Sequence, residues 1–461
     1  MSILVHVALL SGQTVSIPAE PAESVWKLRQ KVQRLLRIGV CALINSSGTV
    51  LRENVSIQES GLRDGTRVNA MASKVQLLSR RECKAFALIR PDGSVMAWGA
   101  SGSICQPPQS LHAQQIAASV GAFAAVCSDG KVVSWGEPWA GSDSSAVHEQ
   151  LRSVKAVTAS GSAFAAIKDD GRVVTWGQKS SGGDCSAVLP QLTSVVQIVA
   201  SWSAFAAVRV DGSVVTWGDV YRGGDSQPVQ RQLYNVCRVA ATLMSFAAIR
   251  ADGHVVTWGE EWSGGDSTVV EEELVQVCDV VASHRAFAAI ASGRVVTWGD
   301  VESGGCSSLV KPSLHDVMEI SASDSAFAAL RKDGCVVTWG NQATGGDSEA
   351  VQHQLQNVRQ VVASSRAFAA LRYDGRVITW GDPCCGGDSQ LVQEDLCDIH
   401  QMAACQSAFA ALRADGDVIT WGELWVSQDG QYKCQWQKLT DVHSLQTVPE
   451  LLSFQDSRPK K

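Results

Sequence analysis

Residues Ala204–Gly218 read AFAAVRVDGSVVTWG, and near copies of this stretch recur along most of the chain. The first arm, FAAV, alternates between two faces, and the second arm, VVTW, is β-branched and aromatic, as is typical of strands. Asp211-Gly212 separates the arms, and this dipeptide favours a type I′ turn in which both central residues have positive φ. The stretch therefore predicts a β-hairpin.

The predicted hairpin recurs about every 41 residues. Successive Trp-Gly pairs are separated by 37, 41, 41, 41, 40, 41, 41 and 41 residues, and they begin at Trp98, Trp135, Trp176, Trp217, Trp258, Trp298, Trp339, Trp380 and Trp421. Nine of the ten phenylalanines take one fixed place in the copies. Eight copies have Asp-Gly in the turn, whereas the sixth has Ser292-Gly293 and one residue fewer, which explains the 40-residue interval. A fixed period of this length indicates a repeat architecture.

Each repeat also has segments on both sides of the hairpin. A third strand precedes it, as in Val195–Ala200, and a Gly-Gly-Asp loop follows it. After the loop, an apolar pair such as Val229 and Leu233 fits either a short strand or a single helical turn. Three or four short strands per repeat match a propeller blade better than a solenoid coil. We therefore predict a mainly β fold over residues 75–448, a β-propeller of about nine 41-residue repeats with seven to nine blades.

The repeat resembles that of the regulator of chromosome condensation, which also builds the propellers of giant HECT-type ubiquitin ligases. The run A-L-x-x-D-G-x-V-x-x-W-G, as in Ala370–Gly381, carries the likeness. The family's usual G-Q-L-G is replaced by Gly-Gly-Asp-Ser, as at Gly223–Ser226, and its usual His is missing. The pitch is nearer to the compact blades of the bacterial β-lactamase-inhibitor propeller. Because family rings commonly have seven blades, closure of nine is open, and Asp441–Val448 is a candidate closing strand.

Residues 1–72 predict a separate β-grasp domain. Alternating apolar residues over Ile3–Leu9 indicate a strand, and Ser24 is a candidate N-cap for a helix with an apolar face. The basic residues of this helix, Arg29 among them, are expected on its solvated side. The order of elements is similar to ubiquitin, but the last strand continues through Ala72 into the repeats, so the module is not expected to be conjugated.

Two neighbouring residues of this domain, Leu43 and Ile44, match part of the apolar patch by which ubiquitin is recognised. Alternation along a strand places one of them in the core and leaves the other as a candidate contact. Residues 449–461, at the other end of the chain, are predicted to form a flexible tail.

Composition restricts the partners. The 45% hydrophobic and 18% charged residues are typical of a globular protein with a sizeable core. The formal net charge of −7 disfavours nucleic acid as the main partner. No apolar stretch is long enough to span a membrane. Fourteen cysteines at scattered spacings, without a CxxC, favour a reducing compartment and hence the cytoplasm or the nucleus. We expect a monomer.

No catalytic, cofactor or metal site is predicted. The recurring loop acids stand about 41 residues apart, whereas a calcium loop gathers several oxygens within about a dozen residues. We therefore expect them to form Asx turns with their own backbone. These acids are Asp184, Asp225, Asp266, Asp347 and Asp388. No phosphate loop, HExxH motif or nucleophile elbow occurs, and the histidines fall at different repeat positions. The sequence thus indicates a protein that is not an enzyme.

The residues that vary between repeats are the candidates for binding. A rigid scaffold with uniform blades presents its specificity on loops. Candidates just before the Phe strands are Trp202, Met244, Arg285, Asp324 and Arg366. Tryptophans outside the fixed position are candidate anchors for a partner. Besides Trp202, these are Trp139, Trp262 and Trp425.

Two functions from different classes fit these features. The first is a non-catalytic adaptor whose propeller binds a protein and whose N-terminal domain links it to ubiquitin or proteasome machinery. The second, implied by the resemblance, is guanine-nucleotide exchange on a small GTPase. Family members use a protruding insertion for exchange, whereas the blades here are uniform and acidic, which favours the adaptor. Ligase activity would need a HECT or RING segment, and too few residues follow the last Trp-Gly for one.

Overall fold

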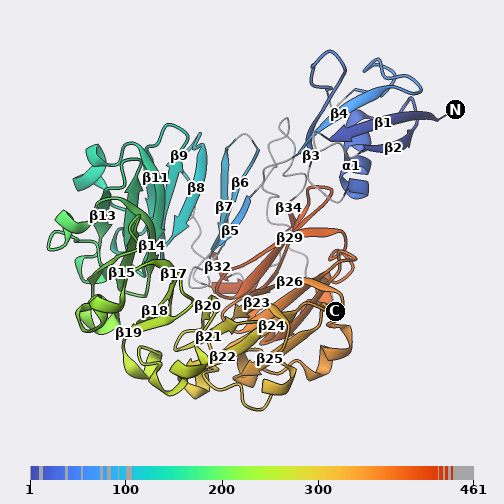
Figure 1. Cartoon of the computed structure of the whole chain (residues 1–461). Coiled ribbons are helices and arrows are strands. Elements are labelled where there is room, and N and C mark those ends of the chain that lie inside the picture. The colour runs from blue at the N-terminus through green and yellow to red at the C-terminus, as the bar shows by residue number, and fades with distance from the viewer. Residues whose placement is uncertain are drawn as a thin grey trace.

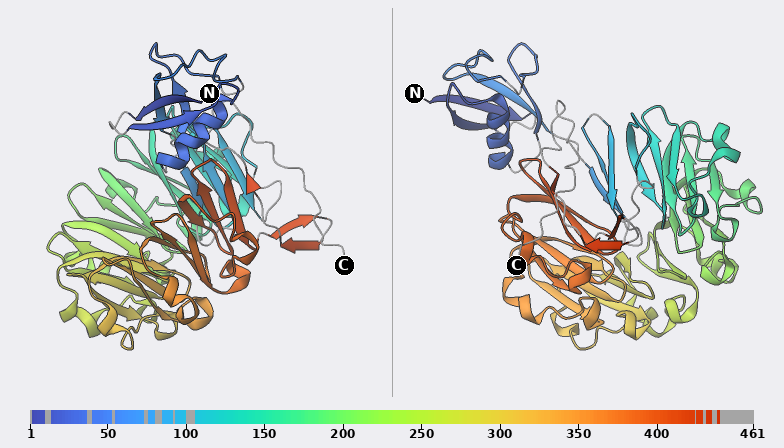
Figure 2. Two further views of the ribbon diagram at one scale, coloured as in Figure 1. Left: turned by 90° about the vertical axis from the view of Figure 1, so that its right-hand side faces the viewer. Right: turned by 180° about the vertical axis from the view of Figure 1, so that it is seen from behind.

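The computed structural model describes residues 2–9, 14–36, 40–52, 55–72, 76–79, 85–91, 93–99, 106–423, 425–428, 431–434 and 438–439. A small N-terminal domain stands outside a ring of β-sheets (Figure 1). It lies next to the place where the first and last sheets of the ring meet (Figure 2).

The N-terminal domain is a mixed four-stranded sheet with one helix. Its elements are β1 (Ile3–Leu9), β2 (Thr14–Ala19), α1 (Val25–Leu36), β3 (Val40–Ile44) and β4 (Arg67–Ala72). The strand order is β2-β1-β4-β3, with β1 and β4 parallel and the other neighbours antiparallel. Val25, Leu28 and Val32 bury one face of α1 in the domain core. This is the predicted β-grasp arrangement, and the relation to ubiquitin stays a prediction.

One expectation for α1 is wrong. Arg29 is fully buried, and its guanidinium donates a hydrogen bond to the carbonyl oxygen of Val40 at 2.8 Å. A guanidinium is tolerated in a core where its N–H groups find acceptors. The basic residues of the helix therefore do not share one solvated face.

Nine sheets form the ring, each with an inner, a middle and an outer antiparallel strand. The inner strands are β5 (Gln76–Ser79), β8 (Ala113–Ala118), β11 (Val154–Ala159), β14 (Val195–Ala200), β17 (Val236–Ala241), β20 (Val277–Ala282), β23 (Val317–Ala322), β26 (Val358–Ala363) and β29 (Ile399–Ala404). The middle strands are β6 (Ala85–Ile89), β9 (Ala122–Cys127), β12 (Ala163–Lys168), β15 (Ala204–Arg209), β18 (Ser245–Arg250), β21 (Ala286–Ala291), β24 (Ala326–Arg331), β27 (Ala367–Arg372) and β30 (Ala408–Arg413). The outer strands are β7 (Val95–Gly99), β10 (Val132–Gly136), β13 (Val173–Gly177), β16 (Val214–Gly218), β19 (Val255–Gly259), β22 (Arg294–Gly299), β25 (Val336–Gly340), β28 (Val377–Gly381) and β31 (Val418–Gly422).

Two 3₁₀-helices follow the outer strand in blades two to eight. The first of each pair is η2 (Pro138–Ala140), η4 (Lys179–Ser181), η6 (Val220–Arg222), η8 (Glu261–Ser263), η10 (Val301–Ser303), η12 (Gln342–Thr344) or η14 (Pro383–Cys385). The second is η3 (Ser145–Gln150), η5 (Leu189–Gln191), η7 (Gln227–Gln232), η9 (Thr268–Glu273), η11 (Lys311–Ser313), η13 (Glu349–Gln354) or η15 (Gln390–Val392). The segment that the sequence left open between strand and helical turn is therefore helical.

The second helices cover the open edges of the outer strands. In blade four the amide of Gln230 donates to the carbonyl oxygen of Val214 at 3.0 Å, and Gln352 and Gln393 do the same in blades seven and eight. An exposed strand edge invites pairing with other chains, so this cover protects the ring. Three-stranded blades with a 41-residue pitch therefore need no fourth strand.

The ring is a closed nine-bladed propeller. Within each blade the Phe and Trp rings stack with centroids 5.1–5.5 Å apart. This pair packs against the alanine face of the preceding blade, so the described residues form one apolar cluster per interface. The ninth cluster joins the last blade to the first through Ala408 and Leu412 on one side and Phe86 and Trp98 on the other.

The last blade gains a short fourth strand, β34 (Lys438–Leu439), which pairs with β31. A separate hairpin of β32 (Trp425–Gln428) and β33 (Gln431–Cys434) projects from the ring (Figure 2). The candidate closing strand Asp441–Val448 and the predicted tail, residues 449–461, lie outside the described residues.

The turn type predicted for the Asp-Gly hairpins is wrong. In the turn of blade four only Gly212 has positive φ, at 74°, and its N–H donates to the carbonyl oxygen of Arg209 at 2.9 Å. This is a three-residue loop in which a type I turn is followed by a left-handed glycine. The sixth hairpin, with one residue fewer, has positive φ at both Ser292 (50°) and Gly293 (77°). The type I′ geometry therefore occurs where the deletion shortens the loop to two residues.

Indole hydrogen bonds connect neighbouring blades. In blades three to nine, Nε1 of the fixed Trp donates to a glycine carbonyl oxygen of the preceding blade at 3.0–3.1 Å, as from Trp339 to Gly304. Within the described part of the chain, Nε1 of Trp98 is buried without such a partner. The closing interface therefore lacks a bond that these other interfaces have.

This difference predicts unequal effects for one substitution. Both Trp339→Phe and Trp98→Phe remove the same indole atoms, but only the first leaves a glycine carbonyl unpaired. We expect Trp339→Phe to lower the free energy of unfolding by about 1–3 kcal/mol more than Trp98→Phe. Urea unfolding of the two variants measures the difference, and equal losses would show that the indole bonds contribute nothing.

Candidate protein-binding face

One end of the ring carries the variable tips and is called the loop face. At this end, a loop in each blade connects the inner strand to the middle strand, and the outer strand ends beside this loop. The opposite end carries the Asp-Gly turns and is called the turn face.

A belt of backbone hydrogen bonds runs around the loop face from blade two to blade nine. In blades two to eight, one residue of each tip has an N–H that donates to the carbonyl oxygen of the equivalent residue in the next blade, at 2.8–3.2 Å. The belt residues are Val120, Gly161, Trp202, Leu243, His284, Asp324, Ser365 and Gln406. Because every link is between main-chain atoms, the side chains of the belt are free to vary without breaking it.

A buried hydroxyl fixes each tip to the first 3₁₀-helix of its blade. In blade six, Oγ of Ser283 accepts the N–H of Ala286 at 3.1 Å and donates to the carbonyl oxygen of Ser303 at 2.8 Å. The equivalents are Ser119, Ser160, Ser201, Thr242, Ser323 and Ser364. Cys405 takes this place in blade nine, where burial raises its pKa to about 12. These bonds hold the tip and the helix beside it as one unit.

The five tip candidates all lie on the loop face. Trp202 is half-buried, because its indole ring packs against Gly161 of the preceding blade. A Cβ added at Gly161 would lie 3.2 Å from this ring. Met244 is also half-buried, and Arg285 and Arg366 are exposed. Part of the Trp202 ring therefore packs between two blades and is less accessible to a partner. The side chains of Arg285 and Arg366 are more accessible.

Aromatic side chains of the first 3₁₀-helices project beside the tips. Trp139 is 61% exposed and Trp262 46%. The guanidinium of Arg285, from the next blade, lies over the ring of Trp262 at 4.8 Å from its centroid. Tyr221, 78% exposed, takes the equivalent position in blade four. Tyr221 is not among the candidates predicted from the sequence. It lies 41 residues before Trp262, so the repeat period would have indicated it.

Pairs of a basic and an acidic residue occupy the other side of this face, on blades six to eight. Nε2 of His284 lies 2.9 Å from a carboxylate oxygen of Asp324 in the next blade. Arg366 lies 3.1 Å from Asp382, whose side chain also caps η14. The face thus has an aromatic part on blades two, four and five and a charged part on blades six to eight.

The remaining candidates lie elsewhere. Leu43 is 1% exposed and belongs to the core of the N-terminal domain, so it is the one of the two neighbours that points inward. Ile44 is half-buried and pairs with Asn69. Trp425 belongs to β32, outside the blades.

The loop acids form the predicted Asx turns. A carboxylate oxygen of Asp225, for example, accepts the N–H of Gln227 at 2.9 Å. The equivalents are Asp184, Asp266, Asp347 and Asp388. Among the residues that the structure describes, no group of His, Cys, Asp or Glu is placed to hold a metal ion. No helix of the described chain is long and apolar enough to cross a membrane.

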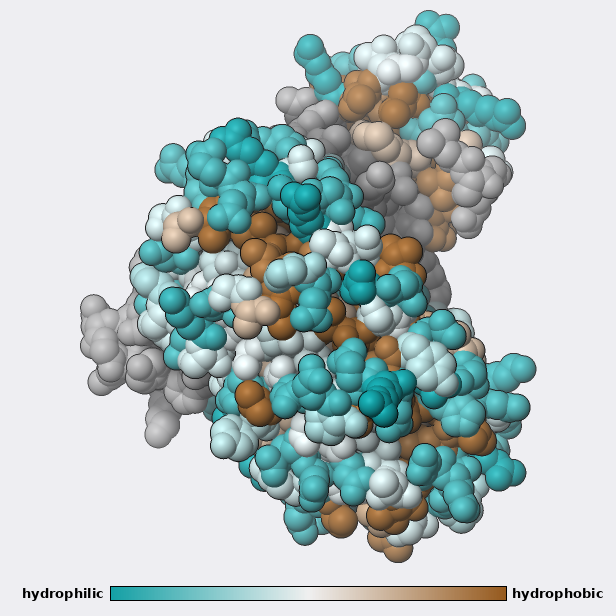
Figure 3. Space-filling model, turned by 60° about the vertical axis from the view of Figure 1, so that its left-hand side comes forward, coloured by the Kyte–Doolittle hydropathy of each residue, from teal (hydrophilic) through white to brown (hydrophobic). Residues whose placement is uncertain are grey.

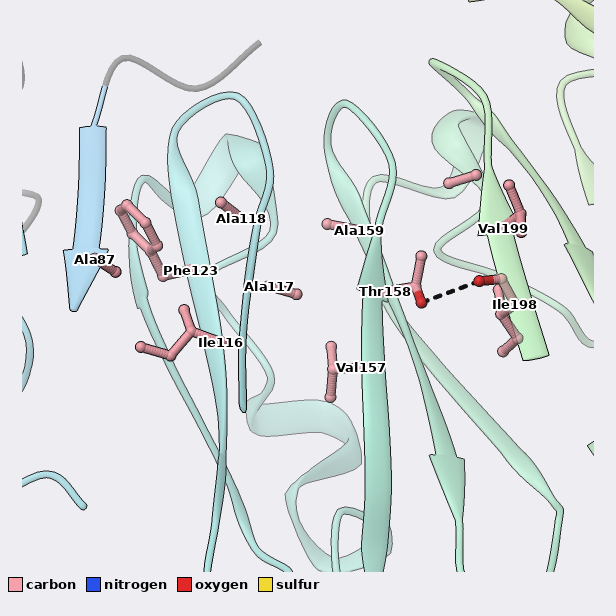
Figure 4. Close-up of a pocket in the computed structure, with 11 residues that line it drawn as sticks. Ala87, Ile116, Ala117, Ala118, Phe123, Val157, Thr158, Ala159, Ile198 and Val199 are labelled. Carbon is pink, nitrogen blue, oxygen red and sulfur yellow. Dashed lines mark hydrogen bonds between the residues drawn. The ribbon is translucent and has the colours of Figure 1, made fainter. Parts of the chain in front are cut away.

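A cavity of about 390 Å³ lies among the inner strands of blades two to four (Figure 4). Its walls are alanine, valine, isoleucine and phenylalanine side chains, such as Ile116 and Val157. The polar exception is Thr158, whose hydroxyl donates to the carbonyl oxygen of Ile198 at 3.2 Å (Figure 4). Among the described residues, no titratable group lines this cavity. On the outside, Figure 3 shows apolar side chains in several patches among polar ones.

No protein-family model matches the chain. No curated protein matches it either. Similar solved structures include the ectodomain of the Arabidopsis thaliana receptor kinase ACR4, with 14% identity, a TM-score of 0.38 and coverage of 67% of this chain and 95% of that one. Another is Prp20p of Saccharomyces cerevisiae, with 15% identity, a TM-score of 0.34 and coverage of 51% and 73%. Yeast RCC1 (Prp20) belongs to the family that the repeat resembles. These TM-scores are too low to transfer a function.

Proposed function

We propose that the chain is a non-catalytic protein-binding scaffold whose loop face contacts the partner. The observation that carries this proposal is the rigid presentation of varied side chains. The belt joins eight tips through main-chain bonds, and a buried hydroxyl fixes seven of these tips to the helix beside them. Exposed aromatic and arginine side chains on these rigid units are the residue types that dominate protein interfaces.

A partner-capture experiment with face-specific variants tests this function. The loop-face variant combines Trp139→Ala, Tyr221→Ala and Trp262→Ala. The control combines Val210→Ala and Tyr373→Ala, which lie in turns of the opposite face and are 72% and 63% exposed. For a partner captured by the wild type, we expect the loop-face variant to raise Kd about 30-fold or more, as for loss of a hot spot of about 2 kcal/mol. Unchanged binding by this variant, or loss in the control, would contradict the assignment.

The link to the ubiquitin pathway is a finer proposal and rests on the N-terminal domain. With Leu43 in the core, the patch expected by analogy with ubiquitin reduces to Ile44. Capture with the full chain and with a chain lacking residues 1–72 tests the link. We expect ubiquitin or proteasome components to be lost with the deletion, and their retention would contradict it.

Guanine-nucleotide exchange on a small GTPase is the second proposal, supported by the resemblance of the repeat. Nucleotide release from a panel of small GTPases tests it. Accelerated release would favour exchange over a scaffold without activity. Ten cysteines of the described chain are free, which accords with the proposed cytoplasmic or nuclear location.

A further inference from the structure

The internal repeats offer a comparison between two equivalent tryptophans. Trp139 and Trp262 are the middle residues of η2 and η8, and each helix is preceded by a glutamate, Glu137 or Glu260, whose side chain makes no cap hydrogen bond. Over Trp262 lies the guanidinium of Arg285, which stands 23 residues later in the sequence. The residue 23 positions after Trp139 is Ser162. The hydroxymethyl of a serine is too short to cover an indole ring.

The surroundings of Ser162 match those of Arg285. In both blades the carbonyl oxygen of this residue accepts the N–H of the residue that follows the outer Trp-Gly, at 2.9 Å from Gln178 to Ser162 and from Asp300 to Arg285. The two backbones therefore take the same place, and the difference between them is the side chain. Trp139 accordingly is more exposed than Trp262, at 61% against 46%.

Trp139 also lines a groove of about 830 Å³ between blades two and three. The groove contains the exposed carboxylates of Asp143 and Asp184 and the apolar side chains of Val147 and Leu189. Hydrogen bonds from the Ser145 hydroxyl and backbone N–H lower the pKa of Asp143, so it is charged at neutral pH. Lys179 lies 3.9 Å from Asp184, which leaves the groove with an excess of negative charge.

We propose that this groove binds an arginine side chain of a partner protein, with the guanidinium over Trp139 in the position that Arg285 takes over Trp262. A cation over the face of an indole is attracted by the ring quadrupole, and arginine is the cation most often found there. The carboxylates at the groove add electrostatic complementarity. The proposal rests on the scaffold function and specifies the chemistry of its partner.

The test uses the full chain and a short fluorescein-labelled peptide with two arginines in a Gly-Ser background, followed by fluorescence anisotropy. The same peptide with citrulline in place of arginine keeps the shape and removes the charge. We expect the arginine peptide to bind and the citrulline peptide to bind about ten-fold more weakly or not at all. Equal binding of both peptides, or no binding of either, would overturn the proposal.

Four variants show where on the ring the peptide binds. In Ser162→Arg, the new guanidinium of the chain itself should lie over Trp139 and weaken peptide binding about ten-fold. Trp139→Ala should weaken peptide binding by a similar factor, because the ring is removed. Arg285→Ser should uncover Trp262 and add a second site, which doubles the bound peptide at saturation. Val210→Ala is the control and should leave binding unchanged, because Val210 is 72% exposed on the turn face, at the opposite end of the ring. If both Ser162→Arg and Trp139→Ala bind as the wild type does, the arginine site is not there.

Failure of the arginine site can be distinguished from failure of the scaffold proposal. Thermal unfolding of each variant shows whether it is folded, and a folded Trp139→Ala that still binds the peptide overturns the site even where Ser162→Arg is disrupted. A partner lost with the loop-face variant but insensitive to Ser162→Arg would support the scaffold and refute the arginine site.

Discussion

Phe287→Ala is expected to lower the free energy of unfolding of the ring by about 3–5 kcal/mol, the range for removing a buried phenylalanine. The Phe287 ring is fully buried and stacks on Trp298 with centroids 5.1 Å apart. It packs into the apolar cluster with Ala247 and Ile249 of the preceding blade. Its loss therefore opens a cavity at the interface with the preceding blade, and urea unfolding measures the effect.

Val269→Ala is the control for this prediction. Val269 is 95% exposed in η9 of the preceding blade, so its truncation should change stability by no more than about 0.5 kcal/mol. A loss for Phe287→Ala close to that of the control would show that the interfaces do not depend on the repeated ring.

Gly345→Ala is expected to destabilise the ring by about 2–5 kcal/mol through two effects that act together. Gly345 has φ of +92°, outside the range that alanine prefers, and an added Cβ would lie 2.6 Å from Cδ2 of Phe368. A left-handed conformation costs about 1–2 kcal/mol for a residue with a Cβ, and forcing extra atoms into a packed core costs about 1–3 kcal/mol. Thermal or urea unfolding of the variant gives the sum.

Gly293→Ala separates the two effects. Gly293 has φ of +77°, but the nearest atoms to an added Cβ are 3.7 Å away, so this variant carries the backbone strain without the clash. We expect a loss of about 1–2 kcal/mol. An equal loss in the two variants would mean that the Phe368 ring moves aside at no cost and that the tight contact does not matter.

Local patterns predicted the parts of a blade well. The alternating FAAV arm, the β-branched VVTW arm and the small residues of the inner strand all became strands with the expected partners, as in Phe205 opposite Trp217. The turn was wrong, because Asp-Gly is compatible with more than one loop length and the neighbouring strands decide which forms. Arg29 shows the same limit, since helix alternation assigns a face but not the depth of burial.

The candidate face was partly predictable. Variation between repeats led to Arg285 and Arg366, which are exposed, and also to Trp202, which partly covers Gly161 of the neighbouring blade. Variation alone does not distinguish the two, because the pattern contains no information on what lies opposite a side chain. The repeat period predicts Tyr221, which lies 41 residues before Trp262, although the tryptophan pattern alone does not.

By itself the sequence determined the repeat, its 41-residue period and the Phe-Trp core of every blade, because these depend on alternation and spacing within a few residues of each other. Closure of nine blades was decided only in the tertiary structure, where Phe86 and Trp98 meet Ala408 across the ring. The belt and the pair of Arg285 with Trp262 were decided there too. Such contacts depend on the rotation from one blade to the next, which is set by packing between sheets and leaves no periodic signal in the chain.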